Sequence, residues 1–200
     1  MRVLIACEFS GIVREAFARR GHEAWSCDLL PTEIPGNHYQ GDIVEFITEI
    51  DKQWDLVIAH PPCTRLANSG VRWLRERNLW QEMDDAAWFF RNLYLLCFWN
   101  TKRFCIENPI PHKYAMEIIK TEYSQIIQPW QFGHNETKAT CLWLIGLPKL
   151  QPTNIVEDRE QRIHKLSALR GKGSSKTRQQ DRSRTYPGIA EAMASQWGIL

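Results

Sequence analysis

The opening 28 residues constrain the fold of this chain more than any other stretch. The apolar run RVLIACEFSG reads as a buried strand that ends in a Ser-Gly turn. A helical pattern follows over residues 13–20 and ends at Gly21, and HEAWSCD then reads as a second strand ending in Asp28. A strand, a helix and another strand within about 30 residues form a βαβ unit, which is the start of a parallel sheet.

The same alternation continues along the chain. WDLVIAHPPC, KRFCIENP and ATCLWLIGL read as apolar strands, and residues 83–99 and 190–197 read as helices, whereas residues 64–82 read as a long polar loop. Strands that alternate with helices predict an α/β protein with a doubly wound, mostly parallel sheet. A length of 200 residues suits one domain, so we expect a single domain over 1–200.

The composition is that of an ordinary soluble protein, with 44% apolar and 24% charged residues. We expect a cytoplasmic protein, because no run approaches about 18 apolar residues and no apolar leader precedes a cleavage site. The cysteines form no C-x-x-C pair, and the clustered Cys/His spacing of a structural zinc site is absent, so no metal is predicted. They are Cys7, Cys27, Cys63, Cys97, Cys105 and Cys141.

Polar residues follow the predicted strands at their carboxyl ends, where ligands bind in an open parallel sheet. These signals are Glu8-Phe9-Ser10-Gly11, Asp28, Asp42, Pro61-Pro62-Cys63 and Glu107-Asn108-Pro109. Their convergence on one edge of the sheet predicts a functional cleft there.

Asp28 ends the second strand, where an acid can bind two ribose hydroxyls of an adenosine cofactor or can cap a helix. The turn over residues 7–11 contains one glycine and no G-x-G-x-x-G pattern. A pyrophosphate needs closer backbone approach than this turn offers, which disfavours NAD. A cofactor without phosphates fits more easily.

Three roles are open for Cys63: a nucleophile, a metal ligand or a small residue that fills a turn. A reactive thiol needs partial exposure and nearby positive charge or amide donors, and Arg65 is close in sequence. The preceding prolines fix an extended backbone, which is more rigidity than a filler requires. Glu107 leaves the neighbouring apolar strand, where its carboxyl group can hydrogen-bond and protonate a heterocycle. We interpret Cys63 as a nucleophile.

The segment 161–184 is strongly basic, with eight Lys or Arg residues and one acid among Gly and Ser. Such a segment is either a solvated loop or a flexible segment that binds nucleic-acid phosphates.

Taken in order, several blocks of the sequence resemble the cytosine-C5 DNA methyltransferase family. The blocks are ACEFSGIVREAFARRGHEAWSCD, GDI, DLVIAHPPC, ENP, FGHNETKATCLWLIG and TYPGIAEAMA. The resemblance implies a Rossmann-like fold, S-adenosylmethionine as methyl donor and DNA as partner. It also implies that Cys63 adds to C6 of a flipped-out cytosine, that Glu107 contacts N3 and the exocyclic amine, and that C5 receives the methyl group.

The resemblance also implies a cofactor site. Asp28 would hold the ribose and Asp42 the adenine amine, while Phe9 and Gly11 would line the methionine end. Ser10, Ile43 and Pro61 complete the predicted cofactor residues. For nucleic acid we predict contacts from Arg65, Lys172, Lys176, Arg178 and Arg182.

This chain departs from the family pattern at several positions. Lys138 stands where the family has its first arginine, so it takes the predicted catalytic role without the planar fork of a guanidinium. Thr140 stands at the second arginine, and Ser183 and Thr185 stand where an asparagine is expected. Fewer than 40 residues separate Gly146 from the last block, where relatives carry a target-recognition domain. We therefore expect short or relaxed sequence specificity, as in compact phage- or prophage-borne members.

Three alternatives stay open. The same chemistry on RNA, single-stranded DNA or a free cytosine nucleotide is consistent with the missing recognition domain. An amino methyltransferase would place an aromatic residue after its two prolines, where this chain has Cys63. A nucleic-acid-binding pseudoenzyme is consistent with the lost glycines and arginines, but not with intact Cys63 and Glu107.

Overall fold

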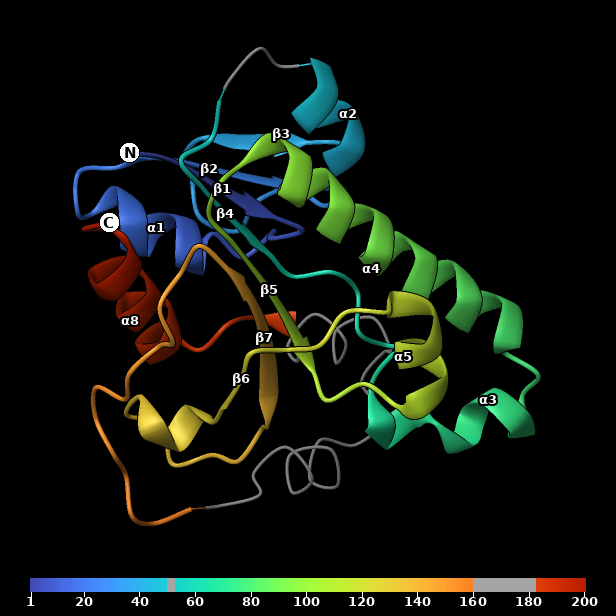
Figure 1. Cartoon of the computed structure of the whole chain (residues 1–200). Coiled ribbons are helices and arrows are strands. Elements are labelled where there is room, and N and C mark those ends of the chain that lie inside the picture. Colours follow the sequence, from blue (N-terminus) through green and yellow to red (C-terminus); the bar gives the residue numbers. More distant parts are fainter. Residues whose placement is uncertain (50–52, 160–182) are drawn as a thin grey trace.

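The computed structural model describes residues 1–49, 53–159 and 183–200 (Figure 1). Its strands are β1 (Arg2–Ala6), β2 (Glu23–Asp28), β3 (His38–Gln40), β4 (Leu56–Ala59), β5 (Phe104–Pro109), β6 (Gln125–Ile127) and β7 (Thr140–Ile145). Its α-helices are α1 (Ile12–Ala18), α2 (Ile43–Glu49), α3 (Arg72–Glu76), α4 (Trp80–Asn100), α5 (Lys113–Ile119) and α8 (Pro187–Trp197). Two short 3-10 helices are η1 (Asn68–Gly70) and η2 (Pro129–Gln131).

The strands of the described residues form one sheet in the order β3-β2-β1-β4-β5-β7-β6. β1 pairs in parallel with β2 and β4, β2 with β3, and β4 with β5, whereas β7 is antiparallel to both of its neighbours. The order along the chain reverses between β1 and β4, which makes this position the switch point of a doubly wound sheet. The prediction of a doubly wound, mostly parallel, Rossmann-like α/β fold is confirmed.

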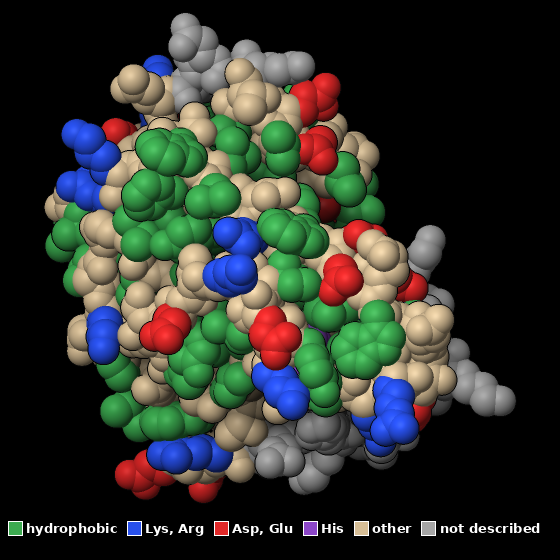
Figure 2. Space-filling view, turned by 45° about the vertical axis from the view of Figure 1, so that its right-hand side comes forward, with side chains coloured by type: hydrophobic (Ala, Val, Ile, Leu, Met, Phe, Trp, Pro, Cys, Tyr) green, Lys and Arg blue, Asp and Glu red, His purple; other side chains and the backbone are tan. Residues whose placement is uncertain are grey.

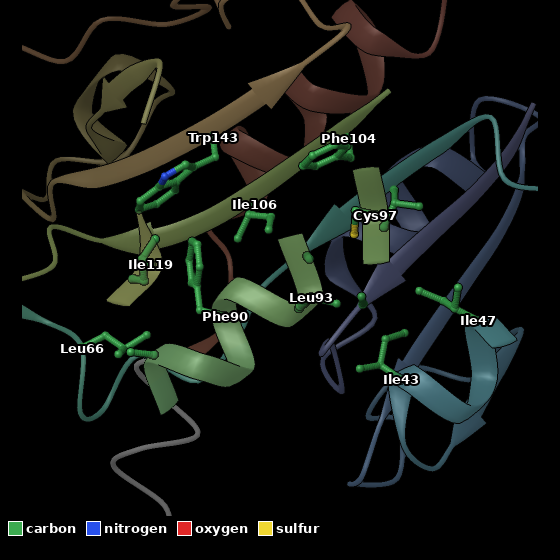
Figure 3. Packing of buried hydrophobic residues seen from close by; sticks show 14 of the residues in the cluster. Ile43, Ile47, Leu66, Phe90, Leu93, Cys97, Phe104, Ile106, Ile119 and Trp143 are labelled. Atoms are coloured by element: carbon green, nitrogen blue, oxygen red, sulfur yellow. The ribbon is translucent and has the colours of Figure 1, made fainter. Parts of the chain in front are cut away.

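Helices cover both faces of the sheet, with α4 and α5 on one side and α1 and α8 on the other (Figure 1). Successive residues of a strand point to opposite faces. Leu4 therefore packs in the cluster that includes α4 and α5, while Val3 and Ile5 pack with α1 and α8. Figure 3 shows Phe90 and Leu93 of α4 lying against Ile106 and Trp143 of the sheet. Strands buried on both faces explain the uninterrupted apolar runs of the sequence.

The structure differs from the prediction over residues 64–82. These residues form η1, α3 and the start of α4 rather than a long polar loop. Leu66 and Leu74 are buried in the core and anchor this segment. A five-residue helix is too short for its apolar period to be recognised, and this explains the wrong prediction.

The outer side of α4 keeps large apolar side chains exposed. These are Trp88, Leu95, Phe98 and Trp99. Figure 2 shows hydrophobic side chains gathered between charged ones on the face that includes this side of the molecule. Within the described ranges, no helix combines the length and the apolar character needed to cross a membrane.

Candidate active site

Glu8 lies in the turn between β1 and α1, and its carboxylate is buried there. It accepts hydrogen bonds from the backbone N–H groups of Val13, at 2.7 Å, and Arg14, at 3.2 Å. Burial raises the pKa of Glu8, although these hydrogen bonds and the charge of His60 oppose the shift. Glu8 thus occupies the amides that begin α1, where an anionic ligand would otherwise bind.

The three predicted cofactor residues of this turn are held closely in place. Ser10 is buried, and its hydroxyl donates to Glu8 and accepts from the Ile12 amide. Gly11 has φ of 72°, and a Cβ atom there would lie 2.8 Å from Nη2 of Arg14. Phe9 is 8% exposed, and the Arg184 guanidinium lies 5.7 Å from its ring centre.

The other predicted adenosine contacts lie at the ends of β2 and β3. Asp28 is half-buried, which raises its pKa, and it accepts a hydrogen bond from the Leu30 amide. Asp42 is exposed and accepts from the amides of Val44 and Glu45 at the start of α2. Ile43 is buried in the core cluster that includes α4. Their cofactor roles stay predictions.

The segment that carries Cys63 is tied to the neighbouring strand. Pro61 is buried, and its carbonyl oxygen accepts a 2.8 Å hydrogen bond from Nδ2 of Asn108 in β5. The Cys63 carbonyl accepts from the amides of Leu66 and Ala67, which closes a tight turn behind it. Cys63 itself is half-buried. The turn holds the thiol near the end of β4 at partial exposure, as a nucleophile requires.

Glu107 and His60 are paired across the strand ends. β4 and β5 register Ala59 with Ile106, so the next residues, His60 and Glu107, are neighbours. Nδ1 of His60 lies 2.8 Å from Oε2 of Glu107, and the two side chains are 7% and 15% exposed. Burial alone would raise the pKa of Glu107, but the hydrogen bond and charge of His60, the charge of Lys138 and a hydrogen bond from Thr140 lower it. Glu107 is therefore an ionised acceptor at neutral pH.

A small pocket opens beside Glu107. Its lining residues are Glu107, Lys138, Thr140, Thr185, Tyr186 and Ile189. Lys138, Thr140 and Thr185 therefore lie around Glu107, although they come from two separate stretches of the chain. The Lys138 ammonium lies 5.8 Å from the Tyr186 ring, and the Tyr186 hydroxyl donates a 2.6 Å hydrogen bond to Glu136.

The predicted nucleic-acid contacts fall into two groups. Arg65 forms an ion pair with Glu82 of α4, with 2.8 Å between Nη2 and Oε2. The other four, Lys172, Lys176, Arg178 and Arg182, lie outside the described residues.

Sequence reasoning gave no role to His60, and it included Asn108 only as part of a strand-end signal, without a partner or a role. Each acts on a partner 47 residues away, His60 on Glu107 and Asn108 on Pro61. The signal that would have found them is the register of two adjacent parallel strands. In that register, the residue after the first strand lies beside the polar end of the second.

Ligands of doubly wound sheets bind beyond the switch point, which lies between β1 and β4 in this sheet. The Glu8 carboxyl group already accepts from the Val13 and Arg14 amides at the start of α1, so these N–H donors are not free for a pyrophosphate. Nε2 of His60 is buried there without a hydrogen-bond partner in the described part of the chain. No cluster of three or more His, Cys, Asp or Glu side chains that could hold a metal ion occurs among these residues.

No protein-family model and no curated protein matches the sequence. Among solved structures, the chain is similar to a putative DNA modification methyltransferase encoded within a prophage of E. coli (15% identity, TM-score 0.47, covering 78% of this chain and 52% of that one). It is also similar to the methyltransferase EhMeth of Entamoeba histolytica (15% identity, TM-score 0.41, covering 78% of this chain and 57% of that one). A third similar structure is that of WbdD in complex with a kinase inhibitor (13% identity, TM-score 0.44, covering 71% of this chain and 35% of that one). The chain spans between about a third and somewhat over half of these proteins. The fold assignment rests on the strand order of this chain itself.

Proposed function

We propose that this protein is an S-adenosylmethionine-dependent methyltransferase that acts on C5 of cytosine in DNA. The observation that carries the proposal is the juxtaposition of two strand ends. β4 leads into the turn that carries Cys63, β5 carries the half-buried, ionised Glu107 near its end, and the Asn108–Pro61 hydrogen bond joins the two segments. A nucleophile and a carboxylate carried by adjacent strands at one edge of the sheet are the groups that addition to an electron-poor heterocycle requires.

The chemistry follows from these two side chains. The Cys63 thiolate forms a bond to C6 of the cytosine, and the electron pair of the 5,6 double bond moves to C5. Glu107 accepts a hydrogen bond from the exocyclic amine and orients the base, while the positive charge of Lys138 offsets the negative charge that develops on the ring. S-adenosylmethionine, when bound, supplies an electrophilic methyl group on its sulfonium sulfur. C5 takes up this methyl group, and the electron pair of the broken S–CH3 bond stays on the sulfur. Loss of the C5 proton to solvent then restores the 5,6 double bond and expels the Cys63 thiolate as the C6–S bond breaks.

Two features support this cofactor and substrate. Glu8 holds a buried carboxyl group just after β1, and a ligand with positive sulfonium and ammonium groups would favour the ionised form of that group. The pocket at Glu107 is bordered by Lys138, a positive charge suited to a base carbonyl or a phosphate. DNA as the substrate rests on the resemblance of the sequence blocks and on the basic segment 161–184.

Trapping on an oligonucleotide that contains 5-fluorocytosine tests the proposal. Fluorine at C5 blocks the final elimination, so wild-type protein with S-adenosylmethionine should form a stable covalent adduct. Peptide mapping should place the adduct on Cys63. Cys63→Ala should abolish the adduct, whereas Cys97→Ala, at a buried cysteine of α4, should retain it.

Other outcomes separate the alternatives. Methyl transfer to dCMP, RNA or single strands but not to duplex DNA would replace the substrate and keep the chemistry. Methyl transfer by Cys63→Ala would favour an amino methyltransferase. If S-adenosylmethionine does not bind, the chain is a pseudoenzyme.

A further inference from the structure

His60 stands between the two halves of the candidate site. It directly follows β4, whose neighbours in the sheet are β1 and β5 (Figure 1). Its backbone N–H donates to the carbonyl oxygen of Ala6 at the end of β1, at 2.9 Å. Its side chain reaches the other way and places Nδ1 2.8 Å from Oε2 of Glu107. One residue thus contacts the strand ends on both sides of β4.

The Glu107 contact determines which ring nitrogen carries a proton. The pKa of Glu107 is lowered, so its carboxylate is ionised and can only accept a hydrogen bond. Nδ1 of His60 therefore carries the hydrogen of this pair. In the neutral ring, the other nitrogen, Nε2, is then a hydrogen-bond acceptor.

Nε2 of His60 lacks a hydrogen-bond partner among the described residues, although it is buried. The side chain is only 7% exposed, so bulk water does not solvate it freely. Buried polar atoms in folded proteins are nearly always satisfied, and an exception calls for an absent partner. A bound ligand is one such partner.

The location of His60 indicates which ligand this is. The strand order reverses between β1 and β4, and ligands of doubly wound sheets bind beyond this switch point. Glu8 directly follows the turn after β1, close enough to His60 for their electrostatics to be coupled. A buried carboxylate next to an acceptor nitrogen suits a ligand group that donates N–H or O–H bonds.

We propose that His60 couples the methyl-donor crevice to Glu107: Nδ1 positions the Glu107 carboxylate, and Nε2 accepts a hydrogen bond from an ammonium or hydroxyl group of the bound donor. This inference rests on the proposed function. His60 is a positioning residue for the base and a binding residue for the donor.

Two matched variants separate the two bonds. In His60→Asn the amide nitrogen falls near the position of Nδ1, so the bond to Glu107 is retained and the donor contact is lost. In His60→Gln the amide falls near the position of Nε2, so the Glu107 bond is lost while a polar group still faces the crevice. Titration calorimetry with S-adenosylhomocysteine measures donor affinity, and the rate of 5-fluorocytosine adduct formation measures the positioning of Glu107.

We expect each variant to impair a different one of these two measurements. His60→Asn should weaken binding of S-adenosylhomocysteine about tenfold, as loss of one hydrogen bond to a polar ligand does, and should keep the adduct rate at saturating donor. His60→Gln should bind within a fewfold of wild type and form the adduct at least about tenfold more slowly. Equal effects of the two variants on both measurements would overturn the coupling.

A spectroscopic measurement tests the two contacts of His60 without any turnover. The ring nitrogens of 15N-histidine-labelled protein report tautomer and hydrogen bonding, and the His60 signals are those missing from His60→Gln. S-adenosylhomocysteine should shift Nε2 and leave Nδ1 protonated, while Glu107→Gln should shift Nδ1 in the absence of ligand. Ligand binding to wild type that leaves Nε2 unmoved overturns this inference alone. Failure of wild type to bind the ligand overturns this inference and the proposed cofactor together.

Discussion

Nδ2 of Asn108 donates a 2.8 Å hydrogen bond to the carbonyl oxygen of Pro61, and both residues are buried. This bond and the His60–Glu107 contact both tie β5 directly to the segment that leads to Cys63. The relative position of thiol and carboxylate thus depends on a side chain that takes no part in the proposed chemistry.

Replacing this donor should disturb both stability and reaction. Asn108→Asp keeps the shape but removes the N–H group, which leaves the buried Pro61 carbonyl unsatisfied. We expect the free energy of unfolding, measured in urea, to fall by about 1–3 kcal/mol. The 5-fluorocytosine adduct should also form more slowly. Asn92→Asp, at an exposed position of α4, is the control and should change neither quantity. Unchanged stability of Asn108→Asp would mean that the bond does not brace the segment.

Gly11 and Gly21 provide a matched pair that separates backbone strain from crowding. Both have positive φ, but a Cβ atom at Gly21 meets nothing within 4 Å, whereas at Gly11 it lies 2.8 Å from Arg14 Nη2 and 3.1 Å from Ile34 Cβ. Gly21→Ala should lower the free energy of unfolding by about 1–2 kcal/mol, the strain of the left-handed conformation. Gly11→Ala should lower the free energy of unfolding by about 1–3 kcal/mol more than Gly21→Ala. The added Cβ atom crowds Arg14, and this buried side chain cannot easily move because several hydrogen bonds hold it. Equal losses in urea denaturation would show that the turn can relax.

The basic segment should control the salt dependence of DNA binding. Replacing Lys172, Lys176 and Arg178 together by Gln should weaken binding to a duplex. If each contacts a phosphate, the slope of log affinity against log salt should become shallower by about 2.7, since each contact contributes about 0.9. Fluorescence anisotropy over a salt series measures this slope.

A second triple variant controls for net charge. Lys102, Lys120 and Lys149 are exposed and lie outside the basic segment, and their replacement by Gln removes the same total charge. This variant should keep the slope of wild type. If both triple variants reduce the slope of log affinity against log salt equally, binding follows net charge and the segment has no special role.

The sequence predicted the parts of this protein that depend on local patterns. Strands covered on both faces are continuously apolar, so the βαβ start and the strands before Cys63 and Glu107 were recognisable, and the strand ends placed these two residues at one edge. His60 and Asn108 were not predicted as site residues because their partners lie 47 residues away, in a register that only the paired strands establish. The Gly11 constraint was hidden for the same reason, since it comes from packing against Ile34 on a later loop.

Glu107 should stabilise the fold at neutral pH and cease to do so in acid. Its pKa in the folded state is lowered from the ordinary value of 4.5. Such a group contributes stability that is fully present above pH 4.5 and is lost as the pH falls through the folded pKa. The difference in free energy of unfolding between wild type and Glu107→Gln should therefore shrink steadily below pH 4.5. Urea titrations from about pH 3 to 6 measure it, and a difference that is constant with pH would contradict the pairing with His60.

Glu8 should show the opposite dependence on pH. Burial raises its pKa above the ordinary value of 4.5, so its contribution is fully present below pH 4.5 and is lost as the pH rises through the folded pKa. Relative to Glu8→Gln, wild type should lose stability as the pH rises from 4.5, because the buried carboxylate must then ionise. The Gln side chain can still accept from the Val13 amide, which limits the structural effect of the substitution. Saturating S-adenosylhomocysteine should reduce the wild-type loss, since a cationic ligand group in the crevice favours the ionised carboxylate. A loss of stability with pH that is the same with and without ligand would place the positive group of the ligand away from Glu8.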